Sequence, residues 1–185
     1  EGARGRIVSL NAMFIDAIRD TPLLVTVTSL MKRPRTDFWR VSFAVPDAPD
    51  QIVFTADIIT SLDRNGELSF EETRPEAPLP EDVKRAKGFA APGWFDHIDQ
   101  RWTVGRPFTV SEKPYSITWA RDAEERPLDA KSLITLSDAI APRTFFVSEK
   151  PTFGSTISFS VTLYASEADF AEVGTDFVMI EGDSD

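Results

Sequence analysis

The sequence predicts an α+β fold built from two similar units, and three observations support this prediction. A segment with helical spacing of apolar residues is followed by segments in which apolar and polar residues alternate. The same order occurs a second time, and a proline-rich stretch separates the two runs. The 185 residues are enough for one large domain or two small ones. We therefore predict a first unit over residues 1–74, a linker over 75–112 and a second unit over 113–185.

The first unit begins with a predicted helix near residues 8–19, which Pro22 would end. Its apolar residues recur at the spacing of one buried helical face, at Leu10, Met13, Phe14, Ala17 and Ile18. The period then changes to two, which is typical of strands. We predict about four antiparallel strands with the helix on one face of their sheet. The strands lie within LLVTVTSLMKR (23–33), DFWRVSFAV (37–45), QIVFTADIITSL (51–62) and GELSFEET (66–73).

The predicted linker is marked by its composition. Six of the thirteen prolines lie between residues 73 and 114, and one short helix is predicted around EDVKRAKGF (81–89). Trp94 and Trp102 indicate that the linker is held against the rest of the protein.

The second unit repeats the pattern with strands in YSITWARD (115–122), GSTISFSVTLYA (154–165) and TDFVMIEGD (175–183). A helix is predicted near residues 128–141, because Leu133, Leu136 and Ile140 recur at helical spacing. Asp138 stands beside this apolar stripe. A carboxylate in such a place costs free energy unless a partner stabilises it, so Asp138 requires a structural or functional reason.

Composition excludes several classes of function. Thirty acidic residues against twenty basic ones give a net charge of −10, which argues against nucleic acids and anionic membranes as partners. The chain has no cysteine, so disulfides, thiolate metal sites and cysteine nucleophiles are excluded. The single histidine, His97, has no G-x-S-x-G nucleophile motif to serve, so an exposed linker histidine is favoured over a catalytic one. No apolar run approaches the roughly 20 residues of a membrane span, and without a visible signal peptide we expect a cytoplasmic protein.

The segment SLDRNGELSFEE, from Ser61 to Glu72, fits most of an EF-hand calcium loop. Ser61 replaces the Asp expected at the first position, and Pro75 stands where the exit helix should continue. A β-hairpin turning at Asn65-Gly66 is therefore favoured, with calcium binding as the alternative. We predict no metal site.

Several segments together resemble a known family. IVSLNAMFIDAI, VTVTSLMKRP and DFWRVSFAV, followed by RPLDAKSLITLSDAIAP and GSTISFSVTLYA, are similar to the TesB-like acyl-CoA thioesterases. The resemblance implies a double hotdog fold, in which each unit wraps a curled antiparallel sheet around a helix. It also implies that the first unit lacks its first strand and the second its last strands. We therefore expect a second copy, or residues outside this sequence, to complete the sheets.

The resemblance also implies a site. Asp138 would be the catalytic acid, Thr156 its partner hydroxyl, and a third catalytic residue, a Gln, would fall beyond Asp185. Phe159 replaces a histidine of the family's strand motif. A carboxylate and a hydroxyl together can orient and deprotonate a water that attacks a thioester, and backbone N–H groups can stabilise the oxyanion. Alternatively, Asp138 is a solvent-facing acid at the helix end, and Thr156 is one of four hydroxyls on an exposed strand face.

The expected function is hydrolysis of acyl-CoA or another acyl thioester, without a cofactor. The alternative is a non-hydrolytic hotdog protein that binds acyl ligands, serves as an assembly subunit, or reuses the cavity for a biosynthetic reaction. Basic residues that could bind CoA phosphates, or simply form a solvated surface, are Arg33, Arg35, Lys84, Arg85 and Lys87.

Overall fold

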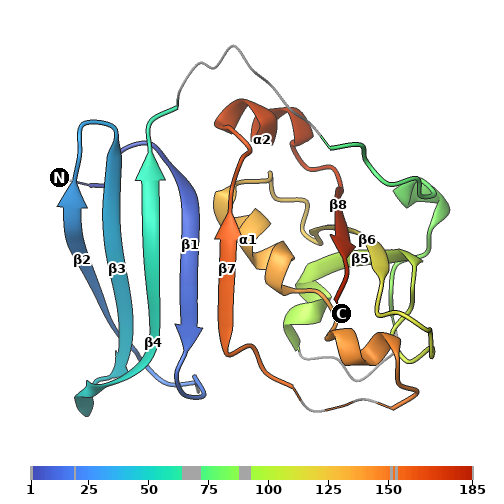
Figure 1. The fold of residues 1–185 in the computed structure, drawn as a ribbon, viewed down its shortest axis with the longest axis horizontal. Helices are drawn as coiled ribbons and strands as arrows, with labels where there is room; N and C mark the ends of the chain where they lie inside the picture. The colour runs from blue at the N-terminus through green and yellow to red at the C-terminus, as the bar shows by residue number, and fades with distance from the viewer. Residues whose placement is uncertain are drawn as a thin grey trace. The chain divides into compact units, whose positions relative to one another are not determined.

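A computed structural model describes residues 2–18, 20–63, 72–87, 93–150, 152 and 154–184 (Figure 1). The chain divides into two compact units, residues 1–67 with 155–166 and residues 68–154 with 167–185. This division differs from the predicted boundaries, because a strand of the C-terminal half belongs to the first unit. The segment for which a hairpin or a calcium loop was predicted lies largely outside the described residues. None of the helices described is long and apolar enough to cross a membrane.

The first unit is a five-stranded antiparallel sheet with the order β2-β3-β4-β1-β7. Its register places one apolar row across all five strands. The row on one side of it is polar, and the row on the other side is polar except for Met13. The apolar row consists of Val27, Val41, Ala56, Ala12 and Phe159. The sheet therefore has one apolar and one polar face, as alternation with period two requires. The strands are β1 (Arg6–Phe14), β2 (Leu24–Lys32), β3 (Thr36–Val45), β4 (Ala48–Ser61) and β7 (Ser158–Thr162).

The helix predicted near residues 8–19 is wrong, because this segment forms the strand β1. β1 lies between β4 and β7 and pairs with both. The apolar residues of the segment also satisfy a period of two, at Val8, Leu10, Ala12 and Phe14. Pairing with a strand on each side provides hydrogen-bond partners for the backbone N–H and C=O groups of β1. This long-range pairing therefore favours the strand over the helix.

The second unit is a three-stranded antiparallel sheet with the order β5-β6-β8. It consists of β5 (Ile98–Val104), β6 (Ser116–Asp122) and β8 (Val178–Gly182). The predicted helix near 128–141 is confirmed as α1 (Ala130–Asp138), which packs on one face of this sheet. The buried core between them contains Ile98, Ala120, Leu136 and Ala139. A further helix that the sequence did not predict, α2 (Glu167–Val173), buries Phe170.

The opposite face of the second sheet is covered by residues 72–87, which we call the strap. The indole Nε1 of Trp119 donates to the carbonyl of Pro78 at 2.8 Å, and Arg101 Nη1 donates to that of Pro80 at 2.6 Å. The Ala86 amide donates to the carbonyl of Gln100 at 2.7 Å. The linker is thus held against the protein, as predicted, but β5 occupies part of its predicted range. The described part of the segment predicted as a short helix contains only the end of a 3-10 turn (Pro80–Asp82).

Candidate active site

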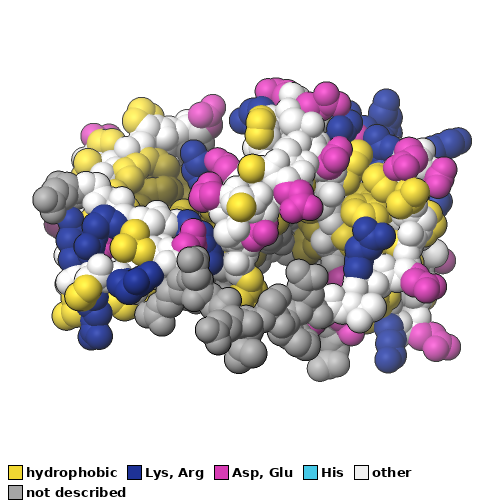
Figure 2. Space-filling view, turned by 90° about the horizontal axis from the view of Figure 1, so that it is seen from above, with side chains coloured by type: hydrophobic (Ala, Val, Ile, Leu, Met, Phe, Trp, Pro, Cys, Tyr) yellow, Lys and Arg dark blue, Asp and Glu magenta, His cyan; other side chains and the backbone are white. Residues whose placement is uncertain are grey.

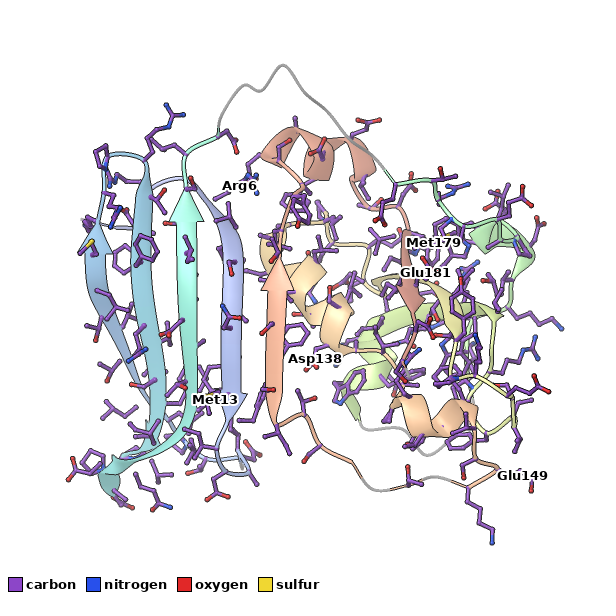
Figure 3. The ribbon with its side chains drawn as sticks, viewed as in Figure 1. Arg6, Met13, Asp138, Glu149, Met179 and Glu181 are labelled. Atoms are coloured by element: carbon purple, nitrogen blue, oxygen red, sulfur yellow. The ribbon has the colours of Figure 1, made fainter. Side chains whose placement is uncertain are left out.

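Asp138 is the last residue of α1 (Figure 3). Its neighbours Leu136 and Ala139 are buried in the core, whereas Asp138 itself is exposed. The apolar stripe beside Asp138 is therefore real, but the carboxylate does not lie within it. A negative charge at the C-terminal end of a helix opposes the helix dipole, an effect of about 0.3–1 kcal/mol at exposed positions. Helix stability alone therefore gives no reason for an acid at this position.

The backbone next to Asp138 is fixed by a buried glutamine. Gln100 is 3% exposed, and its Nε2 donates to the carbonyl oxygen of Ala139 at 2.8 Å. The Ala139 amide in turn donates to the carbonyl of Thr135 at 3.0 Å. Carbonyls of the last helical turn have no partner within their helix, and leaving one buried and unpaired costs about 1–3 kcal/mol. Gln100 thus stabilises the end of α1 from the neighbouring strand.

Sequence reasoning missed Gln100 because it falls inside the predicted linker. The signal that could have found it is the alternation in IDQRWTV, which places Ile98, Gln100 and Trp102 on one side of a strand. A polar residue between two large apolar ones on that side is unusual for a strand that faces a core.

Arg143 holds the chain as it leaves α1. Its Nη1 donates to the Ser116 hydroxyl at 2.9 Å, and its Nη2 donates to the carbonyl of Ala141 at 3.2 Å. Burial lowers the pKa of Arg143. A Cβ atom at Gly182 would lie 2.5 Å from Nη1, so any side chain at this position of β8 would displace the guanidinium. The chain that follows Asp138 is therefore anchored to the second sheet at Ala139 and at Arg143.

The start of α1 has a capping box. Asp129 Oδ1 accepts a hydrogen bond from the Ser132 amide at 2.7 Å, and Ser132 Oγ accepts one from the Asp129 amide at 2.8 Å. These two bonds satisfy amide groups that would otherwise lack partners at the helix start. The bond from the Ser132 amide is the main cause that lowers the pKa of Asp129. Both ends of the helix that presents Asp138 are thus fixed.

Thr156 lies two residues before β7 and is exposed. The Phe14 amide donates to the carbonyl of Ile157 at 2.9 Å, which ties the start of β7 to the first sheet. Thr156 therefore belongs to the first unit, and Asp138 belongs to the second. The pairing of the two side chains stays a prediction.

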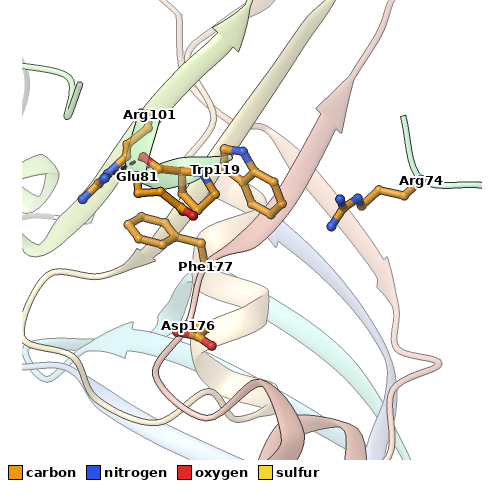
Figure 4. A pocket seen from close by; sticks show the side chains of 7 residues that line it. Arg74, Glu81, Arg101, Trp119, Asp176 and Phe177 are labelled. Carbon is orange, nitrogen blue, oxygen red and sulfur yellow. Dashed lines mark hydrogen bonds between the residues drawn. The ribbon is translucent and has the colours of Figure 1, made fainter. Parts of the chain in front are cut away.

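A hollow of about 570 Å³ lies on the strap side of the second sheet (Figure 4). Arg101 lies 4.5 Å from the ring of Phe177 and pairs with Asp99 at 3.0 Å, so its charge is already compensated. Trp119 lines this hollow and alternates along β6 with Ala120, which contacts α1. The hollow is therefore separated from Asp138 by the sheet. It is lined by Arg74, Pro80, Glu81, Arg101, Trp119, Asp176 and Phe177.

Two other candidates have structural roles. Arg85 Nη2 donates to the carbonyl of Asp96 at 2.9 Å and so helps to hold the strap. His97 is exposed, and its Nδ1 lies 3.5 Å from Glu124 Oε1. We assign these two residues no part in the site.

Comparison with known proteins identifies the family. Residues 71–185 match the family model described as the acyl-CoA thioesterase C-terminal domain. A hot dog fold protein of unknown function from Alicyclobacillus acidocaldarius has a TM-score of 0.89 and 22% identity, over 96% of this chain and 66% of that one. The tesB protein of Mycobacterium avium subsp. paratuberculosis has a TM-score of 0.70 and 17% identity, over 95% and 64%. The acyl-CoA thioesterase II TesB2 of Mycobacterium marinum has a TM-score of 0.50 and 19% identity. This match covers 68% of this chain and 45% of that one.

The chain spans less than two thirds of each of these three structures, and no curated protein matches it. The similar structures establish the predicted α+β hotdog fold, although the first unit has a strand where its helix was predicted. The family model covers more than half of the chain. The chain therefore belongs to the TesB-like acyl-CoA thioesterase family.

Proposed function

We propose that this chain contributes the catalytic carboxylate, Asp138, to a hydrolase that cleaves acyl-CoA or a related acyl thioester. The observation that carries the proposal is an exposed carboxylate at the end of α1, on a helix whose two ends are fixed. A general base must be held in place and must be reachable by its water. The unfavourable position of the charge relative to the helix dipole supports a role other than helix stability.

The proposed reaction needs no cofactor. Asp138 takes a proton from a water molecule, whose oxygen forms a bond to the thioester carbonyl carbon. Backbone N–H groups stabilise the negative charge that develops on the carbonyl oxygen. The C–S bond then breaks, and the proton from the water is passed to the leaving thiolate, which gives a carboxylic acid and a free thiol. We assign to Thr156 the orientation of the water.

The test is acyl-CoA turnover by the full-length protein, followed through release of the free thiol. Asp138→Asn keeps the size of the side chain and removes the base, so we expect kcat to fall by about 10²-fold or more. Thr156→Ala should cost less, because a hydroxyl that only orients the water is partly replaced by solvent. Glu172→Gln removes an exposed acid of α2 in the same unit and is the matched control. If Asp138→Asn and Glu172→Gln have equal rates, Asp138 is not the base.

A non-hydrolytic hotdog protein that binds acyl thioesters is the second candidate. The sequence contains two glutamines, Gln51 and Gln100. Gln51 lies on β4 of the first unit, and the amide of Gln100 is engaged with the carbonyl of Ala139. Neither glutamine of this sequence is therefore assigned the catalytic role that the family gives to a glutamine, because the resemblance places that residue beyond Asp185. Binding of acyl-CoA without turnover by the full-length protein would support this candidate.

A further inference from the structure

A hollow of about 790 Å³ on the first unit is lined by Gly2, Arg4, Lys32, Arg33 and Pro34, and we call it the basic hollow. Three of these residues are cations, and no carboxylate is among the lining residues in the described part of the chain. Lys and Arg side chains gather over this unit in the space-filling view (Figure 2). The whole chain has a net charge of −10, so this local excess of positive charge runs against its composition.

Arg4, which lines the basic hollow, is held by a buried acid. Asp37 is 1% exposed, forms an ion pair with Arg4 and accepts a hydrogen bond from Arg4 Nε at 3.1 Å. This interaction lowers the pKa of Asp37. Arg4 Nη2 also donates to the carbonyl of Arg33 at 2.6 Å, and the Arg33 amide donates to the carbonyl of Thr36 at 2.9 Å. The ion pair of Asp37 with Arg4, to which the charge of Lys32 contributes, fixes this loop, and the cations Arg4, Lys32, Arg33 and Arg35 outnumber this one acid.

The remaining charge of this loop is positive. Lys32 Nζ lies 5.4 Å from the ring of Trp39, and Arg33 is exposed. Arg35 Nη2 donates to the backbone carbonyl of Asp63 at 2.6 Å, and a carbonyl oxygen carries no formal charge to neutralise a guanidinium. Within four residues the loop thus presents three cations on a rigid backbone. A guanidinium group can donate two parallel hydrogen bonds to phosphate oxygens, and a lysine adds a compact positive charge.

The acidic surface of this protein repels an anionic substrate. The first unit has eight basic and nine acidic residues, whereas the second has twelve and twenty-one. A polyanion is repelled by the second unit and is attracted only where the sign of the surface is locally reversed. The nucleotide end of CoA carries a diphosphate and a ribose phosphate, so it needs such a region.

We propose that the basic hollow binds the phosphate groups of the CoA part of the substrate, mainly through Lys32 and Arg33. This inference rests on the proposed function and adds the means by which an acidic protein selects CoA thioesters. A thioester of the same acid without phosphates would not use the hollow. The comparison of two such substrates therefore separates recognition of CoA from hydrolysis.

The experiment uses the full-length protein and two thioesters of one acid, acyl-CoA and acyl-N-acetylcysteamine, which lacks phosphate. For Arg33→Glu and Lys32→Glu we expect KM for acyl-CoA to rise about tenfold or more, which corresponds to about 1.4 kcal/mol. KM for acyl-N-acetylcysteamine and kcat for both substrates should stay unchanged. Arg106→Glu makes the same change in charge at an exposed position of the second unit and should leave all values unchanged.

Three outcomes would overturn the inference. The first is an unchanged KM for acyl-CoA in both Arg33→Glu and Lys32→Glu. The second is a rise in KM that is equal for the two substrates, and the third is a rise in KM for acyl-CoA in Arg106→Glu that equals the rise in these variants. If the wild-type protein cleaves neither thioester, the proposed hydrolysis fails, and the hollow is then tested by titration with CoA alone. Weaker CoA binding by Arg33→Glu than by Arg106→Glu would still support the hollow, and equal binding would overturn it.

Discussion

The two units bury different kinds of side chain. Among the described residues, the buried apolar side chains of the first unit are Ala12, Ala44, Val53, Ala56 and Leu163, most of them small. The second unit buries several large ones, including Ile98, Ile117, Trp119, Leu136, Phe146 and Phe170. The second sheet is covered by α1 on one face and by the strap on the other. The first unit depends more on the pairing of long strands, and every residue of its edge strand β2 is exposed.

This difference separates the tasks of the two units in the proposed enzyme. The core of the second unit fixes the helix that presents Asp138. The first unit offers surfaces, namely the basic hollow and the exposed strand β2. Substitutions in the core of the second unit should therefore affect folding and catalysis, whereas substitutions in the basic hollow and on β2 of the first unit should affect binding.

The largest effect on stability should come from the core of the second unit. Leu136→Ala removes a side chain that is 4% exposed and should lower the free energy of unfolding by about 2–5 kcal/mol. Val25→Ala in β2, where the side chain is 53% exposed, should change it by about 0.5 kcal/mol or less. Urea unfolding of the two variants checks this difference, and equal losses would show that the units do not differ in this way.

The buried glutamine should affect stability and catalysis together. Gln100→Met leaves the Ala139 carbonyl without its partner, so we expect a loss of about 1–3 kcal/mol in the free energy of unfolding. Displacement of the end of α1 should also lower kcat while KM stays near its wild-type value. Gln51→Met, at an exposed position of β4, is the matched control. A Gln100→Met variant with reduced stability and normal kcat would exclude a positioning role for Gln100.

The edge strand β2 allows a test of association. Its apolar side chains are exposed, among them Val27 at 60%, and open edges of this kind pair with other strands. We predict that a second copy of this chain covers β2, so that light scattering gives a mass above that of the monomer. Val27→Lys places a charge on the edge and should weaken association at least tenfold, about 1.4 kcal/mol. A wild-type chain that stays monomeric at all concentrations would contradict this prediction.

Local signals predicted well those elements that depend on local interactions. The alternation around Val25 and Val27 predicted β2, and the spacing of Leu133 and Leu136 predicted α1. The errors arise where distant segments meet. The residues of β1 fit a helix as well as a strand until β4 and β7 pair with it, and the predicted strand around Phe159 joins the first sheet instead of the second.

The candidate site shows the same limit. The apolar stripe drew attention to Asp138, and the family resemblance implied a catalytic role for it. The chain after Asp138 is fixed by residues far away in the sequence, because Gln100 donates to the carbonyl of Ala139 and Arg143 donates to the hydroxyl of Ser116. Such contacts become visible only when the chain is folded.

The smallest predicted effect is the stabilisation of the start of α1 by Asp129, which should depend on pH. The hydrogen bond from the Ser132 amide lowers the pKa of Asp129 in the folded state below its unfolded value of about 3.9. The stabilisation from this charge is therefore fully present above about pH 4 and is lost as the pH falls through the folded pKa. Asp129→Ala should cost about 1 kcal/mol at pH 7, the usual effect of losing a helix cap, and less at pH 3.

The control for this prediction is Asp129→Asn. Asparagine caps helices about as well as aspartate and has no charge to titrate, so this variant should keep most of the stability at both pH values. Thermal unfolding of the three proteins at pH 7 and pH 3 gives the comparison. If Asp129→Asn loses as much stability at pH 7 as Asp129→Ala, the charge of Asp129, and not its capping bond, stabilises α1. The second unit would then resemble the first, where the charge of Asp37 is paired with Arg4.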